Sequence, residues 1–202
     1  MNSLRKYTST CILLSLLWLP SGFSQSAQAP NNAEFNANTQ IHMTPLPGFK
    51  LVGSATMKWL WFELYQAQVL TPTGTYVANH WPLAINLVYQ RSISAEQLLN
   101  ATLDEWQRQN IEYRPQWVAK LQSIWPDIKP QDQLILYVDE ASISYFFFNK
   151  NFIGSFDDTS FASAFSSIWL SKNTLKPTQR DQLIGLKPWL NSTILCTGAC
   201  AY

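Results

Sequence analysis

The sequence predicts an α+β domain in which a layer of helices covers a large antiparallel sheet. Apolar residues switch between the two-residue period of strands and the spacing of amphipathic helices, in the order strands, helix pair, strands, helix pair. Short turn segments separate neighbouring strands, as antiparallel pairing allows. The chain has 202 residues, enough for one domain with a full core, and no internal repeat indicates a second domain.

The opening strands follow a turn at residues 45–48. Phe49–Met57 is predicted to lead into the stretch Lys58–Gln66 (KWLWFELYQ), which we interpret as one strand. One face of that strand carries Leu60, Phe62 and Leu64, and the other carries Trp59, Trp61 and Tyr65. A strand that is apolar on both faces must be covered on both, so we expect it inside the fold. Lys58 and Glu63 would lie on opposite faces, where each charge needs water, a partner or a ligand.

The stretch Pro82–Arg91 (PLAINLVYQR) predicts the next strand. Its more apolar face carries Leu83, Ile85, Leu87, Tyr89 and Arg91. Arg91 is either a guanidinium that reaches solvent beyond the strand end, or a receptor for a carboxylate or phenolate at a pocket mouth beside the Tyr89 hydroxyl. The same two interpretations apply to Lys58 and Tyr65.

Two helices are predicted after this strand. Ser94 and Gln97 have the spacing of a capping box at the start of the first helix. Asp104 can pair with Arg108 one turn later in the same helix. The second helix is predicted within residues 115–126, between two prolines.

The C-terminal half repeats the order of strands and helices. The predicted strands are Gln133–Asp139, Ser142–Phe148 and Phe152–Phe156, with a hairpin turn at residues 149–151. A third helix follows Asp157 and Asp158, which are expected to cap it. A fourth, short helix is predicted at Pro177–Ile184, and Gly185 ends it.

The two ends of the chain lie outside this domain, which we place at residues 46–190. Residues 1–24 have the charged, apolar and small-residue regions of a cleaved signal peptide, with cleavage as late as residue 29 as the alternative. We therefore expect a periplasmic or secreted protein without a membrane-spanning segment after cleavage. Residues 25–45 are expected to be a flexible arm, and residues 191–202 a tail closed by a disulfide between Cys196 and Cys200.

Composition and motifs argue against several function classes. The net charge is +1 and no basic run is present, which argues against nucleic-acid binding. The sequence holds no glycine-rich phosphate loop, no G-x-S-x-G and no H-E-x-x-H motif. His42 and His80 are isolated, so neither a metal site nor a cofactor is expected.

Several segments together resemble the chalcone isomerase-like family, in its bacterial exported branch, over about residues 46–186. They are L-V-G-S-A-T-M-K (Leu51–Lys58), W-F-E-L-Y (Trp61–Tyr65), L-V-Y-Q-R-S-I-S (Leu87–Ser94), W-P-D (Trp125–Asp127), G-S-F-D-D-T-S-F-A (Gly154–Ala162) and I-W-L-S-K-N-T-L-K-P-T-Q-R-D-Q-L-I-G (Ile168–Gly185). The resemblance implies an open-faced β-sandwich with an apolar cleft between a large antiparallel sheet and its helices. Members of the family either close a flavanone ring or bind fatty acids through an arginine.

The chain departs from the ring-closing members at positions that their chemistry needs, and a looser alignment adds Leu98 and Glu105 in place of the family's helix tyrosine and asparagine. The resemblance places the family's arginine at Met57 and its threonine at Leu60. Neither side chain can hold a phenolate or order a water molecule, so we expect no ring-closing isomerase unless another cation serves.

Three hypotheses follow from the sequence. The first is a non-catalytic protein that binds a small hydrophobic or fatty-acid-like ligand, with Lys58, Tyr65, Tyr89 and Arg91 as the candidate polar contacts. The second is an isomerase or intramolecular lyase on an unknown substrate, with Lys58 or Arg91 as the electrophile. The third is an interaction module whose cleft is filled by its own side chains.

Overall fold

A computed structural model describes residues 46–59 and 62–188, which form one six-stranded antiparallel sheet and four helices. The strands lie in chain order across the sheet: β1 (Lys50–Trp59), β2 (Phe62–Thr71), β3 (Leu83–Tyr89), β4 (Gln133–Val138), β5 (Ser144–Phe148) and β6 (Asn151–Phe156). The predicted signal peptide, the arm at residues 25–45, Leu60 and the cysteine tail lie outside the described residues. Of the described helices, none is long and apolar enough to cross a bilayer.

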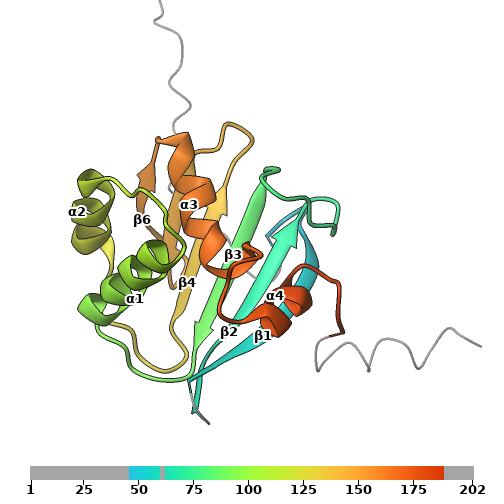
Figure 1. The fold of residues 1–202 in the computed structure, drawn as a ribbon, viewed down its shortest axis with the longest axis horizontal. Coiled ribbons are helices and arrows are strands. Elements are labelled where there is room, and N and C mark those ends of the chain that lie inside the picture. The colour runs from blue at the N-terminus through green and yellow to red at the C-terminus, as the bar shows by residue number, and fades with distance from the viewer. Residues whose placement is uncertain (1–45, 60–61, 189–202) are drawn as a thin grey trace, which may run out of the picture. The chain divides into compact units, whose positions relative to one another are not determined.

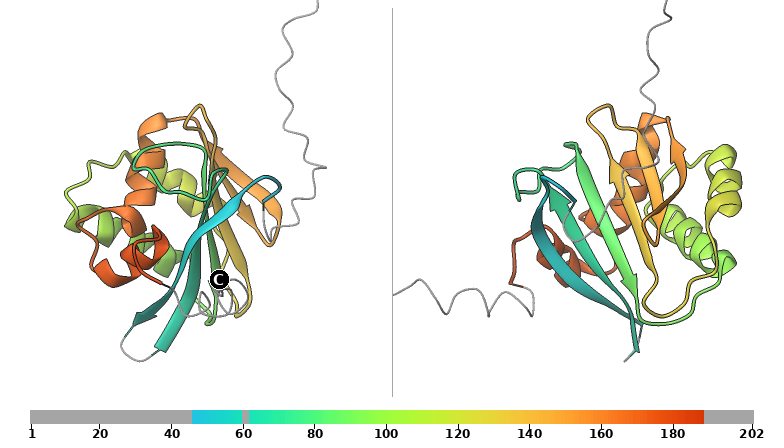
Figure 2. Two further views of the ribbon diagram at one scale, coloured as in Figure 1. Left: turned by 90° about the vertical axis from the view of Figure 1, so that its right-hand side faces the viewer. Right: turned by 180° about the vertical axis from the view of Figure 1, so that it is seen from behind.

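The helices lie on one face of the sheet, as Figures 1 and 2 show. They are α1 (Ala95–Arg108), α2 (Pro115–Ile124), α3 (Thr159–Leu170) and α4 (Pro177–Leu183). α3 contacts β5, α2 contacts β6 and α4 packs on β1, and in Figure 1 the helix layer lies in front of the sheet. The predicted open-faced α+β sandwich and its element order are confirmed.

The main core fills the space between the sheet and the helices, and aromatic side chains dominate it. Trp106 of α1 is fully buried, and its Nε1 donates to the carbonyl oxygen of Ala164 in α3 at 2.8 Å. Phe146 of β5 packs edge-on against Phe165 of α3, with ring centroids 5.1 Å apart. Such edge-to-face contacts stabilise the core beyond its area burial alone, so the helix layer is held firmly over β4–β6.

The opposite face of the sheet carries a small apolar cluster and a row of amides. The cluster contains Leu46, Leu70, Ala84, Ile135 and Phe147. Beside it, Asn86 donates to Gln68 at 3.0 Å and accepts from Gln133 at 2.8 Å, which links β2, β3 and β4. Side-chain hydrogen bonds of this kind satisfy polar groups that no helix covers.

The interpretation of Lys58–Gln66 as one inner strand was wrong. β1 ends at Trp59 and β2 begins at Phe62, so the chain reverses direction within this stretch and forms a hairpin. Lys58 and Glu63 are therefore opposite each other on neighbouring strands instead of on opposite faces of one strand. The hairpin end lies at the surface, because Phe62 is 38% exposed.

The remaining element predictions agree closely with the structure. Ser94 caps α1 in a complete capping box with Gln97, and Asp158 caps α3 by accepting from the backbone of Ser160. The turn between β5 and β6 has positive φ at Asn149 and Lys150, as tight hairpin turns require. One side-chain prediction was wrong, since Arg108 pairs with Glu105 and not with Asp104.

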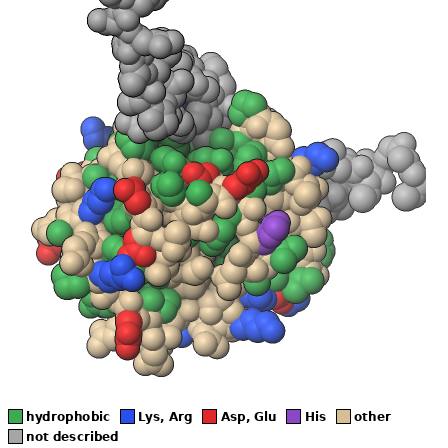
Figure 3. Space-filling view, turned by 90° about the horizontal axis from the view of Figure 1, so that it is seen from above, with side chains coloured by type: hydrophobic (Ala, Val, Ile, Leu, Met, Phe, Trp, Pro, Cys, Tyr) green, Lys and Arg blue, Asp and Glu red, His purple; other side chains and the backbone are tan. Residues whose placement is uncertain are grey.

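The end of the domain at which β2 meets β3 is seen from above in Figure 3. On the described surface of this end, basic, acidic and hydrophobic side chains are interspersed. Mixed charge of this kind creates no field of a single sign.

Candidate functional site

A cavity of about 520 Å³ lies between the sheet and the helix layer. The sheet, α1 and α3 each contribute to its apolar walls. The lining residues include Leu87 and Leu134 of the sheet, Leu98 and Ala101 of α1, and Phe165 and Ile168 of α3. Small-molecule sites in proteins typically have volumes of about 300–1,000 Å³ and mostly apolar walls. The cavity therefore has the size and lining of a site for a small apolar molecule.

Two tyrosines line the sheet side of the cavity. Tyr65 of β2 and Tyr89 of β3 are direct partners in the strand register, and their ring centroids are 5.3 Å apart. The register of β1 and β2 shifts between Met57 and Lys58, so that Leu64 is an extra residue in β2. Such a bulge turns successive side chains toward the same side. Leu64 and Tyr65 accordingly both line the cavity, contrary to the alternation predicted from the sequence.

The hydroxyl of Tyr65 is held by the helix layer. Trp169 of α3 donates its indole N–H to this hydroxyl at 3.0 Å. Burial raises the pKa of Tyr65 to about 12, although the hydrogen bond from Trp169 works in the opposite direction. Burial also raises the pKa of Tyr89, and the neighbouring Tyr65 adds to that effect. Both hydroxyls therefore stay protonated at neutral pH and can donate hydrogen bonds.

Trp125, the residue that ends α2, also lines the cavity. Its side chain is buried, and its Nε1 has no hydrogen-bond partner among the described residues. An indole N–H is a donor only, and burying it unpaired is unfavourable. This donor was missed by the sequence analysis because Trp125 has the spacing of an ordinary core residue in the apolar stripe of α2.

Arg91 lies at the mouth of the cavity, just beyond the end of β3. Its guanidinium carbon is 4.3 Å from the centroid of the Phe62 ring, and both residues line the cavity. The guanidinium is exposed, so it can stack on the ring and still reach an anionic group with its N–H donors.

Lys58, the remaining predicted contact, does not line this cavity. Its Nζ is 3.0 Å from Oε1 of Glu63, and the two side chains are 49% and 53% exposed. The structure thus brings Tyr65, Tyr89 and Arg91 together around one cavity and leaves Lys58 in a surface ion pair. Lys58 lies outside the cavity because the β1–β2 hairpin places it opposite Glu63.

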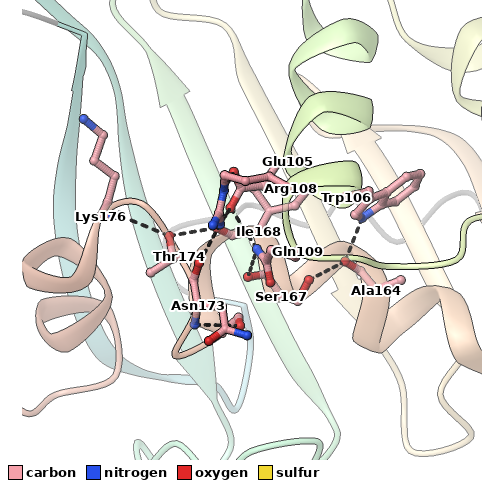
Figure 4. Close-up of polar contacts among 11 residues, drawn as sticks. Glu105, Trp106, Arg108, Gln109, Ala164, Ser167, Ile168, Asn173, Thr174 and Lys176 are labelled. Carbon is pink, nitrogen blue, oxygen red and sulfur yellow. Dashed lines mark hydrogen bonds and ion pairs between the residues drawn. The ribbon is translucent and has the colours of Figure 1, made fainter.

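A smaller cavity of about 200 Å³ shares Tyr65 and Trp169 with the first among its lining residues. Met57, the position at which the resemblance places an arginine, lines it and is buried. Glu105 of α1 also lines it and accepts from Arg108 and Gln109 (Figure 4). Burial alone would raise the pKa of Glu105, but these hydrogen bonds outweigh it and lower the pKa. The carboxylate is therefore committed to a local network.

Within residues 46–59 and 62–188, no three His, Cys, Asp or Glu side chains are grouped to hold a metal ion. The predicted disulfide between Cys196 and Cys200 lies outside the described residues, and it stays a prediction.

The chain matches no protein-family model. It is 27% identical over 149 residues to a Haemophilus influenzae protein described as uncharacterized, and the match covers 73% of each chain. Its fold is similar to the crystal structure of an Arabidopsis thaliana fatty-acid binding protein (AtFAP1), with a TM-score of 0.53. That match covers 69% of this chain and 88% of the Arabidopsis chain at 8% identity. The comparison identifies a chalcone isomerase-like fold.

Proposed function

We propose that this protein is a non-catalytic binder of a small hydrophobic or fatty-acid-like ligand, held in the cavity between β2–β4 and the helices α1 and α3. The observation that carries the proposal is the cavity of about 520 Å³ with apolar walls and a few polar groups. Burial of apolar ligand surface supplies about 25 cal/mol per Å². This is the main favourable contribution in such a site.

The polar end of the ligand is expected at the cavity mouth. Arg91 offers a guanidinium there, and a carboxylate can accept two parallel hydrogen bonds from it. The stack on Phe62 holds the guanidinium beside the apolar opening. A molecule with an alkyl body and an anionic end matches this arrangement. The Arabidopsis protein of similar fold is named for fatty-acid binding, which supports the proposal.

Ligand extraction after incubation with fatty acids tests this function. The protein is stripped of lipid, incubated with a mixture of fatty acids, washed and extracted, and the extract is measured by mass spectrometry. We expect bound fatty acid near one molecule per chain, and the proposal fails if the extract holds none above background.

A pair of matched variants locates the bound ligand. Ala101 lines the cavity but is exposed on α1, so Ala101→Trp should obstruct the cavity while the fold is kept. Asn100→Trp adds the same ring to the neighbouring exposed position, which does not line the cavity. We expect the first variant to lose most of the bound ligand and the second to retain it.

A second candidate function is an isomerase or intramolecular lyase of the chalcone isomerase type. Met57 and Leu60 argue against it, but Arg91 brings a guanidinium to the same cavity as Tyr65 and Tyr89. Chalcone turnover by the wild-type protein, abolished by Arg91→Ala, would favour this candidate over a binding protein. Turnover that survives both Arg91→Ala and Lys58→Ala would exclude these residues as its electrophile. The third hypothesis, a cleft filled by its own side chains, is disfavoured by the cavity volume.

We further propose that the protein acts in the periplasm or after secretion. Arg5 and Lys6 precede the apolar run Cys11–Leu19, which is the pattern of a signal peptide. Fractionation of cells and the mass of the mature protein test this proposal. We expect a mature chain that begins at residue 25, or at residue 30 if the later site is used.

A further inference from the structure

The cavity carries hydrogen-bond donors deep in its wall that the mouth arginine does not explain. We infer that Tyr65, Tyr89 and Trp125 form a donor site for a neutral carbonyl oxygen, such as that of a ketone, an ester or an amide. This inference rests on the proposed function and adds to it the chemical group that the inner part of the ligand carries.

Tyr65 is fixed as a donor toward the cavity by its contact with α3. The indole N–H of Trp169 can only donate, so the Tyr65 oxygen must accept that hydrogen bond. The hydroxyl proton of Tyr65 then remains to be donated, and no described residue accepts it. Because Tyr65 lines the cavity, a ligand oxygen is the acceptor that the site offers it.

Tyr89 and Trp125 add two more donors. Tyr89 is 2% exposed, and its hydroxyl has no hydrogen-bond partner among the described residues. The Nε1 of Trp125 is buried and equally unpaired within the described part of the chain. The great majority of buried hydrogen-bond donors in proteins have a partner. The buried, unpaired N–H of Trp125, in the same cavity wall as the hydroxyl-bearing Tyr65 and Tyr89, therefore indicates an acceptor that arrives with the ligand.

Other polar side chains around the cavity are already engaged. The hydroxyl of Thr102 donates to the carbonyl oxygen of Leu98 at 3.0 Å. The Gln97 side-chain oxygen accepts from the backbone of Ser94 at 2.9 Å in the capping box. No hydrogen bond joins either group to Tyr65, Tyr89 or Trp125 among the described residues, because both are oriented by these contacts within α1 and its cap.

The expected acceptor is neutral because the described inner wall has no cation. Arg91 is the one charged residue among the described lining residues, and it lies exposed at the mouth over Phe62. A carboxylate deep in the cavity would lose its hydration without gaining an opposite charge, which is unfavourable. A carbonyl oxygen accepts two hydrogen bonds without that loss. Any anionic group of the ligand is thus expected at the mouth and the carbonyl inside.

The test uses a pair of isosteric probes, acetylnaphthalene and isopropylnaphthalene, which differ mainly by a carbonyl oxygen in place of a methyl group. Fluorescence titration gives the affinity of each probe for the full chain. We expect the wild-type protein to bind the ketone at least about threefold more tightly than the hydrocarbon, since each net hydrogen bond contributes a factor of about three to ten. The carbonyl stretching frequency of the bound ketone should fall, as hydrogen bonding to the oxygen requires.

Tyrosine variants identify the donors. Tyr89→Phe loses no described hydrogen bond of the protein, so it should keep the hydrocarbon affinity and lose most of the preference for the ketone. Tyr65→Phe should act in the same direction, but it also removes the acceptor of Trp169. Tyr137→Phe, in the side-chain cluster on the opposite face of the sheet, is the matched control and should leave both affinities unchanged.

The possible results separate this inference from the proposed function. Equal affinities of the two probes, or a ketone preference that survives in the Tyr65→Phe/Tyr89→Phe double variant, would overturn the carbonyl site and leave the apolar binding function intact. Failure of both probes to bind the wild-type protein would overturn the apolar site itself, and the carbonyl site with it.

Discussion

At the scale of single residues, two buried tyrosines supply hydroxyl groups to a mostly apolar cavity wall. Tyr65 and Tyr89 face each other across β2 and β3, and burial holds both in the protonated form. A protonated hydroxyl donates a hydrogen bond, whereas a phenolate in the same place would only accept. Because ionisation of these side chains is unfavourable in the folded protein, the stability of the domain should fall at alkaline pH.

Alkaline pH should destabilise the domain through Tyr65. Its pKa is about 12 in the folded protein, against an ordinary value of 10.0, so the unfolded chain loses this proton first. The neutral hydroxyl contributes its stability in full below about pH 10, and the contribution falls as the pH rises toward 12. The loss amounts to about 2 to 3 kcal/mol in the free energy of unfolding. Urea unfolding across this pH range measures it.

The variant Tyr65→Phe should lack this part of the alkaline loss, while Tyr113→Phe, at an exposed ring outside the cavity, should retain it. An alkaline loss of the same size in Tyr65→Phe and in the wild-type protein would show that Tyr65 is not its source.

Glu105 should stabilise the contact between α1 and the segment that follows α3. Its carboxylate accepts from Arg108, which also donates to the carbonyl oxygen of Asn173 at 2.6 Å (Figure 4). Glu105→Gln is expected to lower the free energy of unfolding by about 1 kcal/mol at neutral pH, because a charge-assisted pair is lost. Chemical denaturation measures the change. Glu96→Gln, at an exposed position of the same helix, is the control and should change stability by less than about 0.5 kcal/mol.

The effect of Glu105 should also depend on pH. Its pKa is lowered in the folded protein, so the carboxylate contributes stability above its unfolded pKa and loses it as the pH falls through the folded pKa. The stability difference between Glu105→Gln and the wild-type protein should therefore shrink in acid. A difference that is constant down to the acid transition would contradict this role.

At the scale of elements, the close approach of α4 to β1 depends on a glycine. A Cβ at Gly53 would lie 1.9 Å from the carbonyl oxygen of Gln182 and 2.7 Å from that of Leu183. These are backbone atoms, so the helix would have to move. We expect Gly53→Ala to lower the free energy of unfolding by about 2 kcal/mol or more. Lys50→Ala, at an exposed position of the same strand, should be nearly neutral.

Thermal unfolding of the two variants compares these effects. A Gly53→Ala protein as stable as Lys50→Ala would mean that α4 can move away from β1 at no cost. The segment Leu51–Lys58 contains this glycine within the motif that carries the family resemblance.

The β1–β2 hairpin could not be predicted because its sequence has no turn residues. KWLWFELYQ contains no glycine, proline, asparagine or aspartate, so its alternating apolar residues are typical of one continuous strand. The bulge near Leu64 also has no sequence signal, since it arises from the pairing of two strands. Element types are visible in local patterns, whereas register depends on partners that are distant in the chain.

Helix ends were predicted more accurately than the hairpin because their signals are local. The Ser94–Gln97 capping box and the Asp158 cap each satisfy backbone N–H groups within the same turn. Their side chains need no distant partner, so the residue types and spacing suffice.

At the scale of the whole molecule, the antiparallel sheet and the helix layer were predicted from the sequence, and the site was predicted in part. Tyr89 and Arg91 share the cavity with Leu87, as the strand period predicted. The Tyr65–Trp169 contact could not be predicted, because the two residues are 104 positions apart in the chain. The unpaired indole N–H of Trp125 could not be predicted either, because it depends on how α2 packs in the fold. The fold of the chain matches that of the Arabidopsis fatty-acid binding protein at only 8% identity, so its layers are determined by pattern more than by individual residues.

The proposed function requires that apolar ligands enter the space between the sheet and the helices α1 and α3. Nitroxide-labelled stearic acid, added to protein with labelled methyl groups, tests it most directly, because the nitroxide broadens the NMR signals of nearby methyl groups. We expect much stronger broadening of Leu87, Leu98 and Ile168, which line the cavity, than of Leu70 and Ile135 on the opposite face. Broadening confined to Leu70 and Ile135, or none at any methyl group, would contradict the claim.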